Sequence, residues 1–244
     1  AYGVANQASN AIYGFVNNFQ LAFKPQIIKL YAAGETGKLH VLMFRTSLFS
    51  YYLFLIIAIP FLVNTEEVLQ LWLKTVPEYA VVFCQLMILY FLIDSIQAPL
   101  WTAIYATGNI RSYQLWYSFL VAFNIPLAYT LLKMGMPPYY VLIVRVGLNF
   151  ISAIIRTIYL SYFMNFPAMK YFKSIVLRAA MVTILAYFIA RIINNNSDRN
   201  FTELLLMITL TVGAVIGIIY IIGINKKERM VVNSYVKNVL NRKE

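Results

Sequence analysis

The sequence has very few of the residues that carry most metal and nucleophilic chemistry. It contains one cysteine, Cys84, and one histidine, His40. A single cysteine cannot form an internal disulfide, so a disulfide scaffold and a cysteine-based metal cluster are both excluded. The same counts argue against zinc, haem and Cys–His catalysis. We therefore expect no catalytic residues, no metal, no cofactor and no enzymatic activity.

Charged residues are also scarce, and acidic ones most of all. Only 12% of the chain is charged, with nine acidic against 20 basic residues, while 61% is hydrophobic. Ordinary soluble domains have roughly 25% charged residues. This chain has too little polar surface to cover a water-soluble domain, so the composition predicts an integral membrane protein.

Long apolar runs recur along the whole chain and predict an all-α membrane protein, a bundle of about seven transmembrane helices. Each run is near or above the ~20 residues that cross a bilayer as a helix. The first run is the least apolar, because it is rich in Asn and Gln. The predicted spans are residues 1–23, 44–63, 79–107, 113–132, 139–166, 175–193 and 201–224.

The distribution of basic residues predicts how these spans are oriented. If the spans alternate, one side of the membrane carries fourteen Lys and Arg residues and the other four, Lys74, Lys133, Arg191 and Arg199. By the positive-inside rule the richer side, with the C-terminus, is cytoplasmic. Residue 1 then lies outside, so we expect an odd number of earlier spans of the same protein to precede this chain. The fourteen are Lys24, Lys29, Lys38, Arg45, Arg111, Lys170, Lys173, Arg178, Lys226, Lys227, Arg229, Lys237, Arg242 and Lys243.

The net charge of +11 is explained by topology and by attraction to anionic membrane lipids, which we expect as partners. No basic cluster is interleaved with aromatic residues on a soluble segment, so nucleic acid is not expected. Three segments are predicted to lie as amphipathic helices on the membrane surface: residues 26–33 after Pro25, residues 66–74, and the basic cytoplasmic tail 225–244.

Polar residues inside the spans fall at helical spacing. Asn6, Asn10, Tyr13 and Asn17 form one stripe, at offsets of four, three and four. A second stripe has the same offsets in the fifth span: Arg145, Asn149, Ser152 and Arg156. Asp94 and Gln97 lie one turn apart in the third span, and Pro126 should kink the fourth span just after Asn124.

Charged groups within the membrane cost about 2.5–3.5 kcal/mol each on insertion scales, so Asp94, Arg145 and Arg156 should not face lipid. One interpretation is structural: Asp94 pairs with one Arg, and the Asn residues join helices by hydrogen bonds. The other is a water-filled cavity. Two cations with one acid leave surplus positive charge there, which suits an anionic substrate such as a phosphate.

The chain is expected to divide into a lobe and an appendage. Residues 1–166 form a partial transmembrane lobe of about five helices, which pack with the polar stripes toward a common concave face. Residues 167–224 form two peripheral helices, since the last span is apolar around its circumference.

Several short segments resemble polysaccharide transporters, the bacterial flippases for lipid-linked oligosaccharides in the multidrug/oligosaccharidyl-lipid/polysaccharide superfamily. They are residues 2–7 (YGVANQ), 23–35 (FKPQIIKLYAAGE), 71–78 (LWLKTVPE), Pro99, 106–111 (ATGNIR), 124–126 (NIP) and Gly135. Each is modestly specific, and their order and spacing carry the resemblance across nearly the whole chain.

The resemblance implies roughly twelve to fourteen helices in two lobes around a central cavity. This chain would supply the C-terminal half, and its partner would be the missing N-terminal lobe of the same protein. It implies alternating access that moves an undecaprenyl-pyrophosphate-linked oligosaccharide across the bacterial inner membrane, for O-antigen or other cell-surface polysaccharide biosynthesis. The expected cavity residues are Asn6, Asn10, Asn17, Asp94, Gln97, Arg145, Asn149, Ser152 and Arg156.

Two alternatives stay open. A cation-coupled multidrug exporter of the same superfamily should favour buried acids, and Asp94 is the one clear intramembrane acid. A polytopic acyltransferase or glycan polymerase would need a positioned base or nucleophile, and the spans contain no paired carboxylates.

Overall fold

The computed structural model describes residues 1–194, 200–226 and 228–230. All regular secondary structure in this part of the chain is helical, without a strand. Most of the predicted amphipathic tail lies outside the described residues. The helices are α1 (Tyr2–Ala32), α2 (Thr36–Val63), α3 (Thr65–Trp72), α4 (Ala80–Ala106), α5 (Arg111–Ala122), α6 (Asn124–Lys133), α7 (Tyr139–Met164), α8 (Ala168–Tyr171), α9 (Leu177–Ile193) and α10 (Phe201–Ile218), with π-helical turns η1 (Phe172–Val176) and η2 (Ile219–Gly223).

Six helical segments of the described chain are long and apolar enough to cross a membrane. They are Thr36–Val63, Ala80–Ala106, Arg111–Lys133, Tyr139–Met164, Ala168–Ile193 and Phe201–Gly223. These coincide with the last six predicted spans and support an all-α, multi-pass membrane protein. Helix α1 has 31 residues, about 46 Å at ~1.5 Å per residue, but falls short in apolarity. The count of seven therefore stays a prediction.

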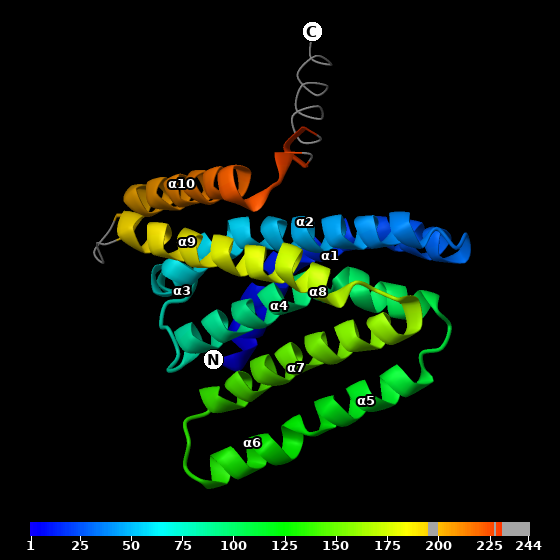
Figure 1. Cartoon of the computed structure of the whole chain (residues 1–244). Helices are drawn as coiled ribbons and strands as arrows, with labels where there is room; N and C mark the ends of the chain where they lie inside the picture. The colour runs from blue at the N-terminus through cyan, green and yellow to red at the C-terminus, as the bar shows by residue number, and fades with distance from the viewer. Residues whose placement is uncertain (195–199, 227, 231–244) are drawn as a thin grey trace.

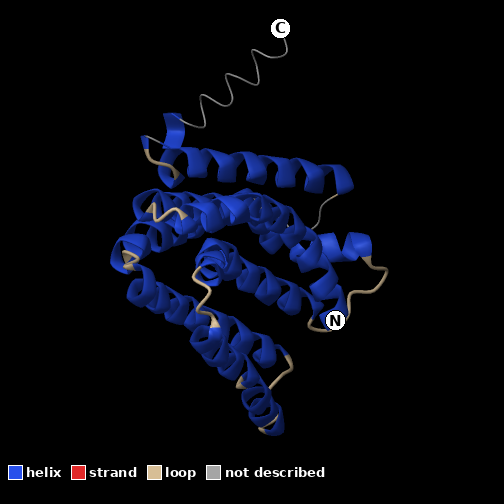
Figure 2. Cartoon of the chain, turned by 90° about the vertical axis from the view of Figure 1, so that its right-hand side faces the viewer, coloured by secondary structure: helices blue, strands red, loops and turns tan. Residues whose placement is uncertain are grey.

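Helix α4 is the centre of the bundle, and α1, α2 and α7 pack directly against it. Large side chains such as Phe54, Met87, Ile88 and Leu100 are fully buried at these contacts. Helices α9 and α10 pack against α2 and against each other. Figure 1 shows the resulting row of helices, from α10 through α9, α2, α4 and α7 to α5 and α6, and Figure 2 shows it from the side.

Helices α5 and α6 form the outer edge of this row, and they contact the bundle through α7. Leu115, Trp116 and Phe119 are each 64% exposed, as expected for a surface solvated by lipid. The helix breaks between Ala122 and Asn124, as Pro126 predicts, because proline cannot donate a hydrogen bond to the preceding turn.

Two sequence-based expectations about surface helices have different outcomes. Residues 66–74 do form a helix over most of their length, α3, whose Leu69 is buried while Trp72 is half exposed. The separate helix expected after Pro25 is wrong, because α1 runs through Pro25 to Ala32. The proline ring is exposed on the helix surface, where its bulk meets no neighbouring helix, and the chain turns at Gly34 instead, with φ 68°.

Candidate functional site

The second polar stripe faces the centre of the bundle. Asn149, Ser152 and Arg156 are buried where α7 packs on α4, and Arg145 is partly buried one turn before them. Residues spaced by three and four lie on one helix face, so a single packing contact brings all four toward α4. The structure thus places this part of the predicted site in one region.

Arg156 is held by uncharged partners. Its Nε donates to the hydroxyl of Tyr113 at 2.8 Å, and its Nη1 donates to Oε1 of Gln97 at 2.7 Å. The guanidinium carbon also lies 5.7 Å from the ring centroid of Tyr117. None of these groups neutralises the guanidinium, so the buried side chain retains its positive charge.

Gln97 connects Arg156 to the middle of the stripe. Its Nε2 donates to the Ile93 carbonyl at 3.0 Å and to Oδ1 of Asn149 at 3.3 Å. Asn149 donates in turn to the Tyr90 carbonyl at 3.1 Å, and the Ser152 hydroxyl donates to the Asn149 carbonyl at 2.7 Å. Because a satisfied buried network has few alternative arrangements, these contacts fix the position of Arg156.

Arg145 occupies the other end of the stripe, about 16 Å away along the axis from eleven residues at ~1.5 Å each. Its Nη1 donates to the Tyr2 hydroxyl at 3.0 Å, and its guanidinium carbon lies 4.6 Å from the ring centroid of Tyr90. A guanidinium over an aromatic face is stabilised by the ring quadrupole without losing its charge.

Asp94 does not pair with either Arg. Its Oδ2 accepts a hydrogen bond from the Tyr13 hydroxyl at 2.6 Å, and the Tyr13 ring stacks on Phe91 with centroids 4.4 Å apart. Within the described ranges the ion pairs are Lys38–Glu35 and Arg178–Glu228. The Asp94–Arg pair of the structural interpretation is therefore not formed among the described residues, because α1 packs on α4 and brings a tyrosine donor to this carboxyl group.

Two cavities lie along α4 and α7, between these helices and the α5–α6 segment. The first has a volume of about 300 Å³ and the second about 260 Å³, and Tyr117 lines both. The first is lined by Tyr90, Tyr117, Leu120, Val121, Asn124, Arg145, Leu148, Asn149 and Ser152. The second is lined by Asp94, Trp101, Tyr105, Tyr113, Gln114, Tyr117 and Arg156.

The two cavities differ in charge. Arg145 is the one charged residue that lines the first cavity, and no carboxylate lines it. Asn124 adds a buried Oδ1 that has no hydrogen-bond partner among the described residues. The second cavity has one acid and one base, Asp94 and Arg156. An anion is therefore better accommodated in the first cavity.

The first polar stripe is only partly brought to this region. Tyr13 reaches Asp94, but Asn6, Asn10 and Asn17 are exposed on α1, and none of them lines either cavity. The buried face of α1 is centred on other positions, Ala5, Ser9, Val16 and Gln20. The stripe lies beside this face, and Tyr13 is its nearest and longest member.

Several cavity residues were not expected from the sequence. Tyr113 and Tyr117 lie one turn apart on α5, and the aromatic spacing could have indicated a common face. Trp101 and Tyr105 have the same spacing near the end of α4. Gln97 was among the expected site residues. Besides its hydrogen bond to Arg156, it borders a third, apolar cavity of about 420 Å³ between α4, α7 and α9.

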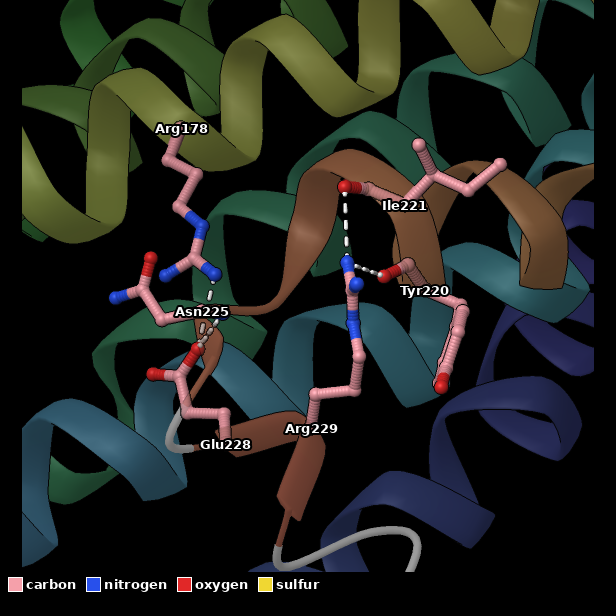
Figure 3. A network of polar contacts seen from close by, with 6 residues as sticks. All are labelled: Arg178, Tyr220, Ile221, Asn225, Glu228 and Arg229. Atoms are coloured by element: carbon pink, nitrogen blue, oxygen red, sulfur yellow. Dashed lines mark hydrogen bonds and ion pairs between the residues drawn. The ribbon is translucent and has the colours of Figure 1, made fainter.

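A separate polar cluster joins the end of the described chain to the bundle, as Figure 3 shows. Arg178 at the start of α9 pairs with Glu228 at 2.9 Å, and both side chains are nearly buried. The Asn225 backbone N–H donates to the same Glu228 oxygen, and Arg229 donates to the Tyr220 carbonyl at 2.8 Å. These contacts fix the segment after η2 against α9.

Comparison with known proteins gives no relative: no protein-family model, no curated protein and no solved structure matches this chain. The function must therefore be argued from the chemistry of the two cavities.

Proposed function

We propose that this protein is a membrane transporter that flips an undecaprenyl-pyrophosphate-linked oligosaccharide across the bacterial inner membrane for cell-surface polysaccharide biosynthesis. The observation that carries this proposal is the pair Arg145 and Arg156. Both line cavities among apolar helices, and neither has a carboxylate partner in the described part of the chain.

A pyrophosphate needs a substitute for its water shell when it crosses a membrane. Leaving a multiply charged group without partners in hydrocarbon is prohibitively costly. Guanidinium supplies both positive charge and fixed donors, which can grip phosphate oxygens in pairs. Arg145 faces the cavity that lacks a carboxylate, so it is the stronger candidate for the first contact with this group.

The stripe also offers successive partners along the path. Asn149 and Ser152 lie between the two Arg residues and line the first cavity. With the guanidinium groups separated by about 16 Å along the helix, they would act at different stages of translocation.

The second candidate is a cation-coupled drug exporter of the same superfamily, and Asp94 is the observation that favours it. This carboxyl group lines the second cavity and uses Oδ2 for its Tyr13 contact. A cationic substrate would pair with Asp94, and its binding would be opposed by Arg156.

Binding to the purified protein in nanodiscs separates the two candidates. Arg145→Gln should weaken polyprenyl pyrophosphate binding about 10- to 150-fold, from the ~1.5–3 kcal/mol of a charged hydrogen bond. Arg191→Gln, an exposed position on α9, is the matched control and should leave binding unchanged. Binding of a lipophilic cation that is lost in Asp94→Asn but not in Arg145→Gln would favour the exporter and contradict the flippase.

A further inference from the structure

Two pairs of aromatic residues from different helices line the second cavity. Trp101 and Tyr105 come from the end of α4, and their rings meet edge to face with centroids 5.3 Å apart. Tyr113 and Tyr117 come from the start of α5, and their rings stack with centroids 5.9 Å apart. The aromatic surface of this cavity is therefore built from two helices, α4 and α5.

Part of this aromatic surface is open. Tyr105 is 46% exposed, and Trp101 and Tyr117 are partly exposed, while Tyr113 is buried against Arg156. The ammonium of Lys24 lies 4.7 Å from the Trp101 ring centroid, a cation–π contact that favours this ring position. Trp101, Tyr105 and Tyr117 thus have contacts within the protein and keep part of their surface exposed.

The polar groups of the cavity retain free hydrogen-bonding capacity. The second carboxyl oxygen of Asp94 accepts no hydrogen bond from the described residues, and Nη2 of Arg156 donates none to them. Gln114 uses its Nε2 for Ser118 at 3.4 Å, which leaves its Oε1 as an acceptor. The cavity combines aromatic faces with both acceptors and a donor.

We propose that the second cavity binds one sugar ring of the substrate, adjoining the pyrophosphate held at Arg145 in the first cavity. This inference rests on the proposed function. A sugar ring has an apolar C–H face that packs on the negative face of an aromatic ring. Its hydroxyl groups donate to carboxyl and amide oxygens and accept from guanidinium.

Other occupants fit this cavity less well. A phosphate would lie beside the Asp94 carboxyl group as well as Arg156 and would be held less well than in the first cavity, and a hydrocarbon chain would leave Asp94, Gln114 and Arg156 without partners. The volume of about 260 Å³ is below the roughly 300–1,000 Å³ of most ligand pockets and suits one ring rather than an oligosaccharide. Tyr117 lines both cavities, so the sugar and the pyrophosphate would be neighbours.

The test compares two lipids: polyprenyl pyrophosphate without a sugar and the same lipid with one sugar attached. Trp101→Leu and Tyr105→Leu should each weaken binding of the glycosylated lipid about three- to tenfold and leave binding of the sugar-free lipid unchanged. Trp116→Leu is the matched control, since this Trp is 64% exposed on the outer face of α5 and lines neither cavity. Melting temperature and size-exclusion profile are recorded for each folded variant.

The outcomes separate this inference from the proposed function. If the Trp101 and Tyr105 variants lose binding of both lipids equally, or lose binding of neither, the sugar site is contradicted while the proposed flippase function stands. Failure of the unaltered protein to bind the sugar-free lipid would overturn the proposed function and this inference with it. Selective loss of the glycosylated lipid supports the inference.

Discussion

Arg156 donates from Nη1 to Oε1 of Gln97 at 2.7 Å, so the guanidinium on α7 is fixed by a neutral amide on α4. A carboxylate at this position would fix the side chain equally well but would cancel its charge. The neutral partner leaves the charge of Arg156 available to a ligand, which is the property that the proposed transport of a pyrophosphate requires.

Gln97→Glu tests this relationship directly. The variant should form an ion pair with Arg156, retain the fold and weaken polyprenyl pyrophosphate binding by about tenfold, because the site loses one unit of positive charge. Gln26→Glu, on the exposed surface of α1, should bind like the unaltered protein. Unchanged binding in a folded Gln97→Glu variant would show that the charge of Arg156 does not reach the ligand.

The contact between Tyr13 and Asp94 should contribute to stability. Tyr13→Phe removes the hydroxyl that donates to Asp94 at 2.6 Å. The carboxyl group is left without this hydrogen bond, at a cost of about 1–3 kcal/mol in the free energy of unfolding. The melting temperature in nanodiscs should fall by several degrees, at roughly 2–4 °C per kcal/mol for a chain of this size. Tyr129→Phe, which is 66% exposed and distant from Asp94 in the fold, should melt unchanged. An equal melting temperature for Tyr13→Phe would mean that this hydrogen bond is not formed in the membrane.

How far the sequence predicts this structure can be judged from these same residues. The stripe from Arg145 to Arg156 was predictable, because helical periodicity alone decides that the four side chains share a face. The partner of Asp94 was not, because Tyr13 lies 81 residues away and reaches it through the packing of α1 on α4. The packed face of α1 follows Ala5 and Ser9, whose small side chains allow close approach, and not the longer Asn residues beside them.

The nearly buried ion pair between Arg178 and Glu228 should matter more than the exposed pair between Lys38 and Glu35. Glu228→Gln leaves Arg178 with an uncompensated charge, and loss of one partner from a buried pair is strongly destabilising. We expect faster tryptic cleavage after Arg229 in Glu228→Gln and no change in Glu35→Gln, because exposed pairs contribute little. The double variant Arg178→Gln/Glu228→Gln should be less sensitive than Glu228→Gln alone. Equal cleavage rates in all variants would contradict an anchoring role.

The orientation predicted from the basic residues can be measured with single cysteines in a Cys84→Ser background. A membrane-impermeant thiol reagent added to intact cells should label Glu66→Cys on α3 and should not label Lys38→Cys near the start of α2. After permeabilisation both positions should react, since both residues are exposed in the fold. Labelling of Lys38→Cys in intact cells would reverse the orientation.

The central claim is that Arg145 and Arg156 carry the substrate's pyrophosphate, and the most direct measurement is glycan export in cells whose only copy of the protein has both Arg residues changed to Gln. Membrane abundance is measured in the same cells, with Arg191→Gln as the control for loss of a cation. Our account predicts that export is abolished at normal abundance and that Arg→Lys at either position retains part of it, because the charge survives while the planar donor pair is lost. Normal export by the double Gln variant would contradict the account.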